Sequence, residues 1–362
     1  MKVVRKMETI QLLKPEHESC TEELQAFQWP EKSEAVLDSS EQTESAGDVF
    51  QWDALEVISG DRCIPKPVHF AWEDMRASSE NTVYDLLISK DTAFEDPMVL
   101  KDIAQPFRSV VNLQIGTRYF WKVIARDNDS VLAVSAVWAF TTHPSTPRWL
   151  CVPGITNVRD MGGWRLPGNR RIRQGLIYRS SEMNGHVDIT DEGRKVLIEE
   201  LNIRTDLDLR GSHEDPKAVL DRTVVKWINT PISPYGNIVA YDSREKYRQI
   251  FKVFSDPSAY PILFHCWGGC DRGGTVAFLL HALLGLDRDA LIRDYELSSL
   301  TIWGERSHLS DLFQSLLSAL LPFGDGKDDV GKQVENYLLS IGVTAEEMAS
   351  IRTHLTGETD HG

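Results

Sequence analysis

Residues 262–277 read ILFHCWGGCDRGGTVA. An apolar, strand-like run ends at Phe264, a glycine-rich loop follows, and a helical pattern begins near Thr275. This order is typical of an anion cradle, because the N–H groups of a tight loop point inward and a helix N-terminus adds about half a positive charge. Glycine permits the sharp turn and the close approach of a ligand. The stretch therefore predicts an oxyanion site between a strand and a helix of an α/β domain.

Cys266 opens this loop and Arg272 closes it six positions later. The positive field of such a loop favours the thiolate, which is the nucleophilic form of cysteine. A guanidinium holds two phosphoryl oxygens at once, which lysine cannot do. The spacing predicts in-line attack on phosphorus and a phosphocysteine intermediate. The alternative is a buried cysteine before a helix-capping loop, and the three glycines within 266–273 disfavour it.

The loop resembles the H-C-x5-R signature of the cysteine-based protein-tyrosine phosphatases. More narrowly, it is similar to the H-C-x-x-G-x-D-R-T-G loop of the atypical bacterial tyrosine phosphatases. Four further stretches match that family in order: NVRDMGG at 157–163, YRSS at 178–181, IRTDLDLR at 203–210, and LLGL at 283–286 followed by DYELS at 294–298. The resemblance covers about 150–355. It implies an α/β cysteine-phosphatase (tyrosine phosphatase-like) domain over 150–358 that needs no metal and no organic cofactor.

The resemblance also implies the role of each residue. Cys266 is the nucleophile and Arg272 binds the phosphoryl group together with the loop amides of Trp267, Gly268, Gly269, Cys270, Asp271 and Arg272 itself. His265 orients the loop, or is a structural histidine bonded to backbone. Asp271 is the first candidate for the general acid and Asp208 the second; the alternative for Asp271 is a salt bridge that positions the Arg272 guanidinium. The sequence WPE at 29–31 lies in the wrong part of the chain to be an acid loop.

Three other polar residues and one hydroxyl complete the expected site. Arg159 and Asp160 are interpreted as a structural pair rather than as substrate contacts, and for Arg179 the two roles are equally favoured. The family usually has threonine after the loop arginine, where its hydroxyl helps to release the thiolate, but this chain has Gly273. Thr275 stands two positions further and is not expected to reach. The second chemical step is therefore in doubt.

Cys270 also differs from the family, which often has alanine or lysine at that position. A lysine there favours highly anionic substrates such as phosphoinositides, so its absence lowers that interpretation. Cys270 is interpreted first as a small residue; the second hypothesis makes it a resolving thiol for oxidised Cys266, provided that the two Cβ atoms come within about 4 Å.

The first part of the chain has a different texture. Short segments rich in β-branched and aromatic residues predict strands at 68–72, 83–89, 107–113, 119–125 and 135–141, a spacing that suggests a β-sandwich. A further strand is expected at 8–14. Trp72 and Tyr119 resemble the core tryptophan and the corner tyrosine of a fibronectin type III module, which implies an all-β fibronectin type III-like domain over 1–145. Residues 31–61 hold nine acidic residues and one lysine and read as an insertion or linker within it.

Composition limits the partners. The 362 residues include 54 acidic and 39 basic ones, a net charge of −15, which disfavours nucleic acid and anionic membranes as partners. No apolar run is long enough to span a bilayer and no signal peptide is recognised, so a cytoplasmic location is expected. Five sparse cysteines predict neither a disulfide scaffold nor a metal site. The expected substrate is a phosphorylated protein or small phosphoester, most simply phosphotyrosine. The alternatives are a phosphoinositide or inositol-phosphate phosphatase and a phosphate-binding pseudophosphatase, and the β-sandwich is expected to bind a protein partner.

Overall fold

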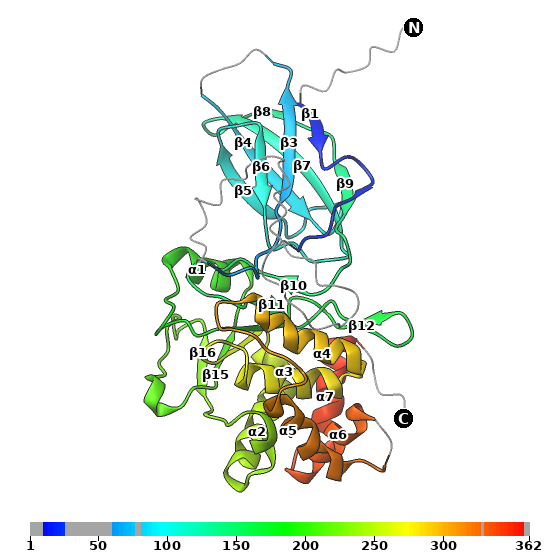
Figure 1. Cartoon of the computed structure of the whole chain (residues 1–362). Coiled ribbons are helices and arrows are strands. Elements are labelled where there is room, and N and C mark those ends of the chain that lie inside the picture. Colours follow the sequence, from blue (N-terminus) through cyan, green and yellow to red (C-terminus); the bar gives the residue numbers. More distant parts are fainter. Residues whose placement is uncertain (1–9, 26–59, 77–80, 327–328, 358–362) are drawn as a thin grey trace. The chain divides into compact units, whose positions relative to one another are not determined.

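The computed structural model describes residues 10–25, 60–76, 81–326 and 329–357 (Figure 1). The chain divides into two compact units: residues 1–25 and 65–148 form the first, and residues 26–64 and 149–362 form the second. Most of the acidic segment at 31–61, the sequence WPE at 29–31 and the start of the expected strand at 8–14 lie outside the described residues.

The first unit is built from strands in two sheets. One sheet has the order β1-β3-β6, and the other has the order β2-β9-β7-β4-β5, with β8 also paired to β7. The strands are β1 (Ile10–Lys14), β2 (Ser19–Cys20), β3 (Val68–Asp74), β4 (Thr82–Ser89), β5 (Met98–Ile103), β6 (Phe107–Val110), β7 (Arg118–Asp127), β8 (Ser130–Val134) and β9 (Trp138–Thr141). The five strands expected between 68 and 141 are therefore present, whereas β5 and β8 were not predicted.

Alternating side chains of these strands make the core of the first unit. Strand β7 buries every second residue, and Trp121, Val123 and Ala125 are fully inaccessible. Phe70 and Phe140 meet edge to face at 5.6 Å between ring centroids. The Tyr119 hydroxyl accepts a hydrogen bond from the Gln114 amide at 2.9 Å, so it closes a corner just before its own strand.

The second unit contains a mixed sheet with the order β10-β11-β14-β17-β15-β16. Strands β14, β17, β15 and β16 are parallel, and β11 joins β14 antiparallel. The strands are β10 (Arg148–Trp149), β11 (Arg159–Asp160), β14 (Ile177–Ser180), β15 (Thr205–Asp208), β16 (Lys226–Asn229) and β17 (Ile262–His265), and a separate hairpin pairs β12 (Arg165–Leu166) with β13 (Arg170–Arg171). Parallel strands end at one edge of a sheet, and that edge is the usual place for a site.

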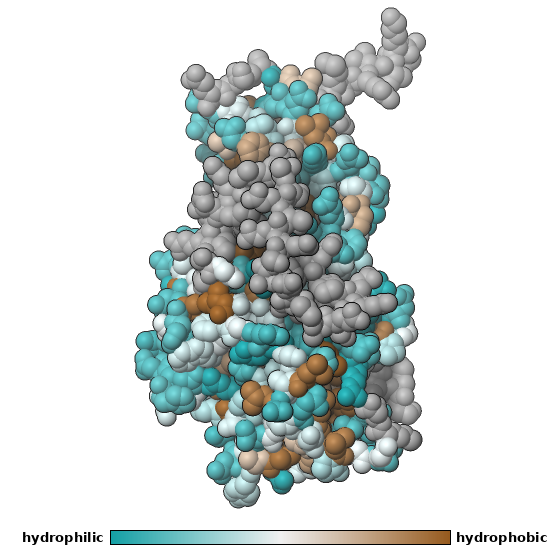
Figure 2. Space-filling model, viewed as in Figure 1, coloured by the Kyte–Doolittle hydropathy of each residue, from teal (hydrophilic) through white to brown (hydrophobic). Residues whose placement is uncertain are grey.

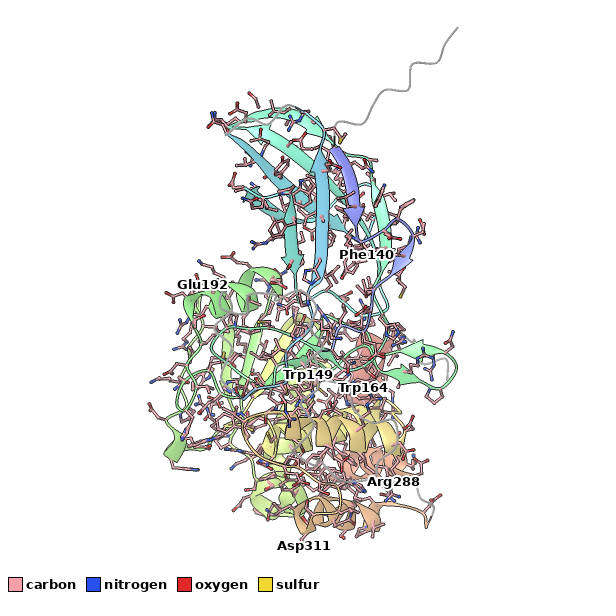
Figure 3. All side chains as sticks on the ribbon, turned by 45° about the horizontal axis from the view of Figure 1, so that its top comes forward. Phe140, Trp149, Trp164, Glu192, Arg288 and Asp311 are labelled. Atoms are coloured by element: carbon pink, nitrogen blue, oxygen red, sulfur yellow. The ribbon has the colours of Figure 1, made fainter. Side chains whose placement is uncertain are left out.

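Helices pack with this sheet around one large core. They are α1 (Asp191–Lys195), α2 (Tyr241–Ser255), α3 (Arg272–Leu283), α4 (Arg288–Glu296), α5 (Asp311–Leu320), α6 (Val330–Ser340) and α7 (Ala345–Thr356). Every residue of α3 after Arg272 is buried, which makes it the central helix. Thr190 caps α1 by accepting a hydrogen bond from the Gly193 amide at 3.1 Å. Trp149 and Trp164 belong to the same core (Figure 3).

Residues 60–64 belong to the second unit rather than to the expected 1–145 domain. The Arg62 amide donates to the Leu300 carbonyl at 3.0 Å, and Cys63 is buried in the core of the second unit. The reason is burial, because Cys63 lies in an apolar core that the β-rich segments do not provide.

None of the helices in the described part of the chain is long and apolar enough to cross a membrane. The visible apolar residues on the helical part of the second unit form small separate patches between hydrophilic ones (Figure 2).

Candidate active site

The loop predicted from the sequence lies at the carboxyl end of β17, between the ends of β14 and β15. Cys266 follows the strand and is only 2% exposed. Gly269 has φ +69°, and a Cβ there would lie 2.4 Å from the Ser180 carbonyl oxygen, so only glycine fits. A Cβ on Gly268 would lie 2.7 Å from the Trp303 ring, which covers this side of the loop.

Arg272 is held by a residue that the sequence did not reveal. Its two terminal nitrogens donate to Glu214 at 2.5 and 2.6 Å, a bidentate pair. Burial opposes the charge on Arg272, but its hydrogen bonds to Glu214 and the neighbouring Cys266 raise its pKa above the ordinary value. The pKa of Glu214 is lowered, because the bonds from Arg272 outweigh burial. The guanidinium is therefore charged and fixed at the loop.

Asp271 has a different partner from the one considered in the alternative interpretation. Its carboxylate forms a bidentate pair with Arg306, at 2.9 Å to Nε and 3.0 Å to a terminal nitrogen. The Tyr235 hydroxyl donates to the same carboxylate. Arg272 is positioned by Glu214, so Asp271 is left for another role.

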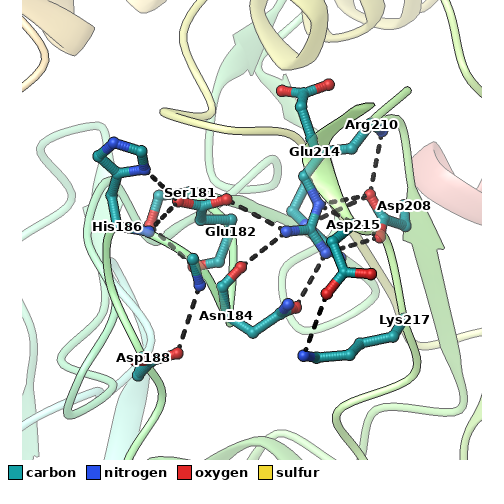
Figure 4. Close-up of polar contacts among 12 residues, drawn as sticks. Ser181, Glu182, Asn184, His186, Asp188, Asp208, Arg210, Glu214, Asp215 and Lys217 are labelled. Atoms are coloured by element: carbon teal, nitrogen blue, oxygen red, sulfur yellow. Dashed lines mark hydrogen bonds and ion pairs between the residues drawn. The ribbon is translucent and has the colours of Figure 1, made fainter. Parts of the chain in front are cut away.

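Asp208 lies in a buried network beside the loop rather than at an open surface. Arg210 donates to both of its oxygens, at 3.0 and 2.9 Å, and also to Glu182 at 3.1 Å (Figure 4). All three side chains are at most 1% exposed. The Asp208 side chain is fully buried, whereas that of Asp271 is 38% exposed, so accessibility favours Asp271 of the two candidates.

His265 is buried between two carboxylates. Its Nε2 lies 3.0 Å from Asp206 and its Nδ1 lies 3.9 Å from Asp208. Burial lowers the pKa of His265, but Asp206 and Asp208 outweigh it and raise the pKa above the ordinary value. The side chain therefore anchors the start of the loop to β15 through charge.

Arg159 and Arg179 converge on Asp294 of α4 behind the loop. Arg159 Nε and an Arg179 terminal nitrogen lie 3.0 and 2.9 Å from its two oxygens. Arg179 also donates to the Gly269 carbonyl at 2.5 Å. Burial and the neighbouring Arg159 lower the pKa of Arg179 to about 10; burial raises the pKa of Asp294, but both arginines outweigh it and lower that pKa to about 2. These residues support the loop from within.

The expected pairing of Arg159 with Asp160 needs correction. Asp160 accepts hydrogen bonds from the Gly162 and Gly175 amides, both at 2.7 Å, while the ionic partner of Arg159 is Asp294. Successive residues of a strand point to opposite faces, so the two side chains serve different sides of β11. Both side chains are buried and bonded within the protein, but not to each other.

Two loop residues with larger side chains point away from the phosphate cradle. The Trp267 ring lies 3.9 Å from the His186 ring, between centroids. The Cys270 thiol donates to the Gly268 carbonyl at 3.2 Å, and burial raises its pKa to about 11. Cys270 is therefore a neutral thiol near pH 7.

Thr275 and Gly273 are the two positions to consider for a hydroxyl that could help to release the Cys266 thiolate. The Thr275 hydroxyl donates to the Asp271 carbonyl at 2.9 Å and accepts from the Tyr235 amide at 3.0 Å, so it is engaged away from the sulfur. A Cβ on Gly273 would lie 3.9 Å from the Cys266 sulfur, an ordinary contact. The position that this chain leaves as glycine is thus the one from which a hydroxyl reaches the sulfur.

A pocket of about 800 Å³ opens beside Asp271 and Arg272. The phenols of Tyr235 and Tyr295, the guanidinium of Arg306 and the side chain of Leu312 line it. It offers an aromatic and apolar wall close to the two charged loop residues, which suits the organic part of a phosphoester. Within the described ranges, no group of three or more His, Cys, Asp and Glu side chains is placed to hold a metal ion.

Sequence reasoning missed Glu214, Tyr235 and Arg306. Each lies outside the recognised stretches: Glu214 and Tyr235 are in short 3-10 helices, Ser212–Glu214 and Tyr235–Val239, and Arg306 is in a loop. Asp294 stood within a recognised stretch, DYELS at 294–298, but its partners follow only from the fold.

Comparisons with known proteins agree with the geometry. Residues 150–357 match the tyrosine phosphatase family. The triple specificity protein phosphatase PtpB of Mycobacterium tuberculosis is 39% identical over 212 residues, covering 45% of this chain and 74% of that protein. A putative tyrosine-protein phosphatase of Cupriavidus necator is 28% identical over 166 residues, covering 39% of this chain; the chain spans only 59% of that relative.

Among solved structures, the core catalytic domain of PP-IP phosphatase SIW14 from S. cerevisiae covers 40% of this chain and 83% of its own length, at 18% identity and a TM-score of 0.29. That likeness is too slight to bear on the fold. The family match and the PtpB relationship stand without it. The chain belongs to the tyrosine phosphatase family, whose match at residues 150–357 falls within the second unit.

Proposed function

We propose that this protein hydrolyses phosphomonoesters through a phosphocysteine on Cys266. The observation that carries the proposal is the pairing of a buried cysteine at the end of β17 with an arginine that Glu214 holds in its charged form at the other end of the loop. A charged, preorganised cradle stabilises the extra negative charge of the transition state.

The proposed reaction has two chemical steps, formation of the phosphocysteine and its hydrolysis. The Cys266 thiolate attacks phosphorus, the bond from phosphorus to the leaving oxygen breaks, and Asp271 gives that oxygen a proton. Water then attacks the phosphocysteine, the P–S bond breaks with its electron pair returning to sulfur, and Asp271 accepts the proton from water. Arg272 and the loop amides hold the equatorial oxygens throughout.

Phosphotyrosine on proteins is the substrate that we propose first. The pocket beside Asp271 and Arg272 has room for a phenyl ring, and its tyrosine and leucine side chains suit an aromatic leaving group. Phosphoinositides or inositol phosphates are the second candidate, because the related PtpB is a triple specificity protein phosphatase, which favours a broad range of substrates. A phosphate-binding pseudophosphatase is the third, because Gly273 lacks the helping hydroxyl.

The first unit is proposed to be a fibronectin type III-like module that binds a protein partner. Its two sheets, the buried Trp72 and the corner hydrogen bond of Tyr119 support this. We also propose a cytoplasmic location for the whole protein.

The decisive experiment compares the wild type with Cys266→Ser on 4-nitrophenyl phosphate. Cys266→Ser should lose turnover by about 10⁴-fold or more, yet still bind phosphate esters in a titration, because the amides and Arg272 remain. Substantial residual turnover in a clean preparation would remove Cys266 from the mechanism, and a wild type without turnover would favour the pseudophosphatase.

A second experiment separates Asp271 from Asp208. Asp271→Asn should lower kcat/KM by about 10²-fold or more for alkyl phosphates, and far less for esters of acidic phenols, because only poor leaving groups need the proton. Asp208→Asn should affect both kinds of ester equally. The opposite pattern would make Asp208 the acid.

A further inference from the structure

All three guanidinium nitrogens of Arg306 donate hydrogen bonds within the protein. Nε and one terminal nitrogen bind the two oxygens of Asp271, while the other terminal nitrogen donates to three backbone carbonyls of its own segment, at Trp303, Gly304 and Glu305. The guanidinium is thus fixed by its own loop before it meets Asp271. A planar fork held in this way defines the orientation of a carboxylate as well as its charge.

Tyr235 reaches the same carboxylate at a conformational cost. Its φ is +60°, in the left-handed region that bulky residues rarely adopt. Its amide donates to the Thr275 hydroxyl at 3.0 Å, and that hydroxyl donates to the backbone of Asp271. Strain of this kind persists only where the surroundings enforce it, and it gathers at functional sites.

The direction of the hydrogen bonds follows from counting protons. Tyr235 has one hydroxyl hydrogen, which it donates to Asp271, so the 2.9 Å contact between the Tyr235 and Tyr295 hydroxyls must have Tyr295 as donor. Burial and the nearby Asp271 raise the pKa of Tyr235 far above its usual range, which keeps the phenol protonated. Asp271 therefore receives hydrogen bonds from Tyr235 and Arg306 at both of its oxygens.

We propose that Arg306 and Tyr235 are positioning residues that hold Asp271 as a carboxylate for the second half of the reaction, in which it accepts the proton of the water that hydrolyses phosphocysteine. This inference rests on the proposed function and deepens it. Asp271 becomes ionised when it has protonated the leaving group, and the three donors on its two oxygens orient the side chain in that form for the base step. The side chain of Asp271 is 38% exposed, which leaves water access to it.

Arg306→Gln tests the proposal by separating the two steps. Rapid mixing with 4-nitrophenyl phosphate should give a burst of nitrophenol at the wild-type rate, because this leaving group needs no acid. The steady rate should fall by about tenfold or more, and acid-quenched samples should contain more phosphoenzyme. Tyr235→Phe should act in the same direction but less strongly, and Arg306→Lys should recover part of the loss, since it keeps the charge without the fork.

A double-mutant comparison shows that both residues act through Asp271. Asp271→Asn should slow hydrolysis of the phosphoenzyme, and adding Arg306→Gln to it should cause no further slowing. Two matched controls should leave both phases unchanged: Arg352→Gln removes a partly buried pair with Glu335, and Tyr337→Phe removes a buried phenol hydrogen bond to the Ile238 carbonyl.

Two results would overturn the inference. One is hydrolysis of the phosphoenzyme at the wild-type rate in both Arg306→Gln and Tyr235→Phe; the other is an equal loss in the burst and in the steady rate, which is what a general disturbance of the loop would produce. The proposed function fails in a different way, namely if the wild type forms no phosphocysteine at all.

Discussion

Charged residues support the two sides of the catalytic loop in opposite ways. Behind the loop, Arg159, Arg179 and Asp294 are at most 4% exposed and bind one another and the backbone of Gly269. In front, Arg272, Arg306 and Asp271 line the pocket with side chains that are 17%, 20% and 38% exposed, while Glu214, the partner of Arg272, is 4% exposed. The buried group fixes the shape of the loop, whereas the three pocket-lining side chains are open to substrate. The comparison teaches that ion pairs of the same chemistry serve architecture or reaction according to their contact with water.

The largest effect is expected from Asp294→Asn, which removes the shared carboxylate of the three residues behind the loop, here called the rear group: Arg159, Arg179 and Asp294. Two buried guanidiniums would lose their shared carboxylate, which should cost about 3–5 kcal/mol of stability in the second unit. Because the folded pKa of Asp294 lies below its ordinary value, its contribution is present above about pH 4 and is lost as the pH falls toward 2. Calorimetry of the full chain should show the loss at pH 7 and a weaker acid dependence in the variant. Asp289→Asn, exposed on the same helix, should change neither; an Asp294→Asn unit as stable as the wild type would refute a structural role for the rear group.

Glu214→Gln tests the front in isolation. Arg272 would keep its charge but lose a bidentate partner, so kcat/KM for an aryl phosphate should fall by about 10–100-fold. Stability should also fall, by about 1–3 kcal/mol, because the Glu214 carboxylate is only 4% exposed and its hydrogen bonds are weakened. Glu305→Gln, on the rim of the same pocket, is the matched control. A large loss of stability with unchanged kinetics would mean that Glu214 belongs with the rear group.

Gly273→Thr tests the second chemical step, the hydrolysis of phosphocysteine. A hydroxyl there lies within reach of the Cys266 sulfur, so it should help to expel the thiolate, raise kcat several-fold and shrink the burst. Gly273→Ala fills the same space without a hydroxyl and should leave the burst as it is. If the wild type shows no burst, thiolate release is not slow and the missing hydroxyl is unimportant.

The smallest effect is expected at Cys270. Its pKa of about 11 means that little thiolate exists near pH 7, so any disulfide with peroxide-oxidised Cys266 should form slowly and form faster as the pH rises toward 11. Mass spectrometry at pH 7 and 9, with Cys270→Ala as control, measures this. In that variant, over-oxidation of Cys266 to sulfinic acid should increase. Equal recovery of both proteins by dithiol reductants at each pH would leave Cys270 as a small residue only.

Local signals in the sequence identified the catalytic loop and most strands of the first unit. The C-x5-R spacing and its glycines encode their own geometry, and the apolar run that ends at Phe264 marks β17. The strands β5 and β8 escaped notice because their side chains are largely exposed and lack alternation.

The partners of the loop were beyond local reasoning. Glu214 meets Arg272 across 58 residues and Arg306 meets Asp271 across 35, so only the folded chain brings them together. The pairing expected between Arg159 and Asp160 was wrong for a different reason: neighbouring residues of a strand point to opposite faces, and the partner of Arg159, Asp294, lies far along the chain. A charged residue in the sequence indicates that it will need an ionic partner if it is buried, but does not identify that partner.

The contact between Trp303 and Gly268 has a thermodynamic consequence. The indole ring fills the place that a side chain would take, and its nitrogen donates to the Thr156 hydroxyl at 2.8 Å, so the protein itself braces the loop. An oxyanion entering such a cradle has little chain to order. Calorimetric titration of phosphate or vanadate should therefore show a small entropic penalty, and the tightness of binding should depend on charge rather than on folding of the loop.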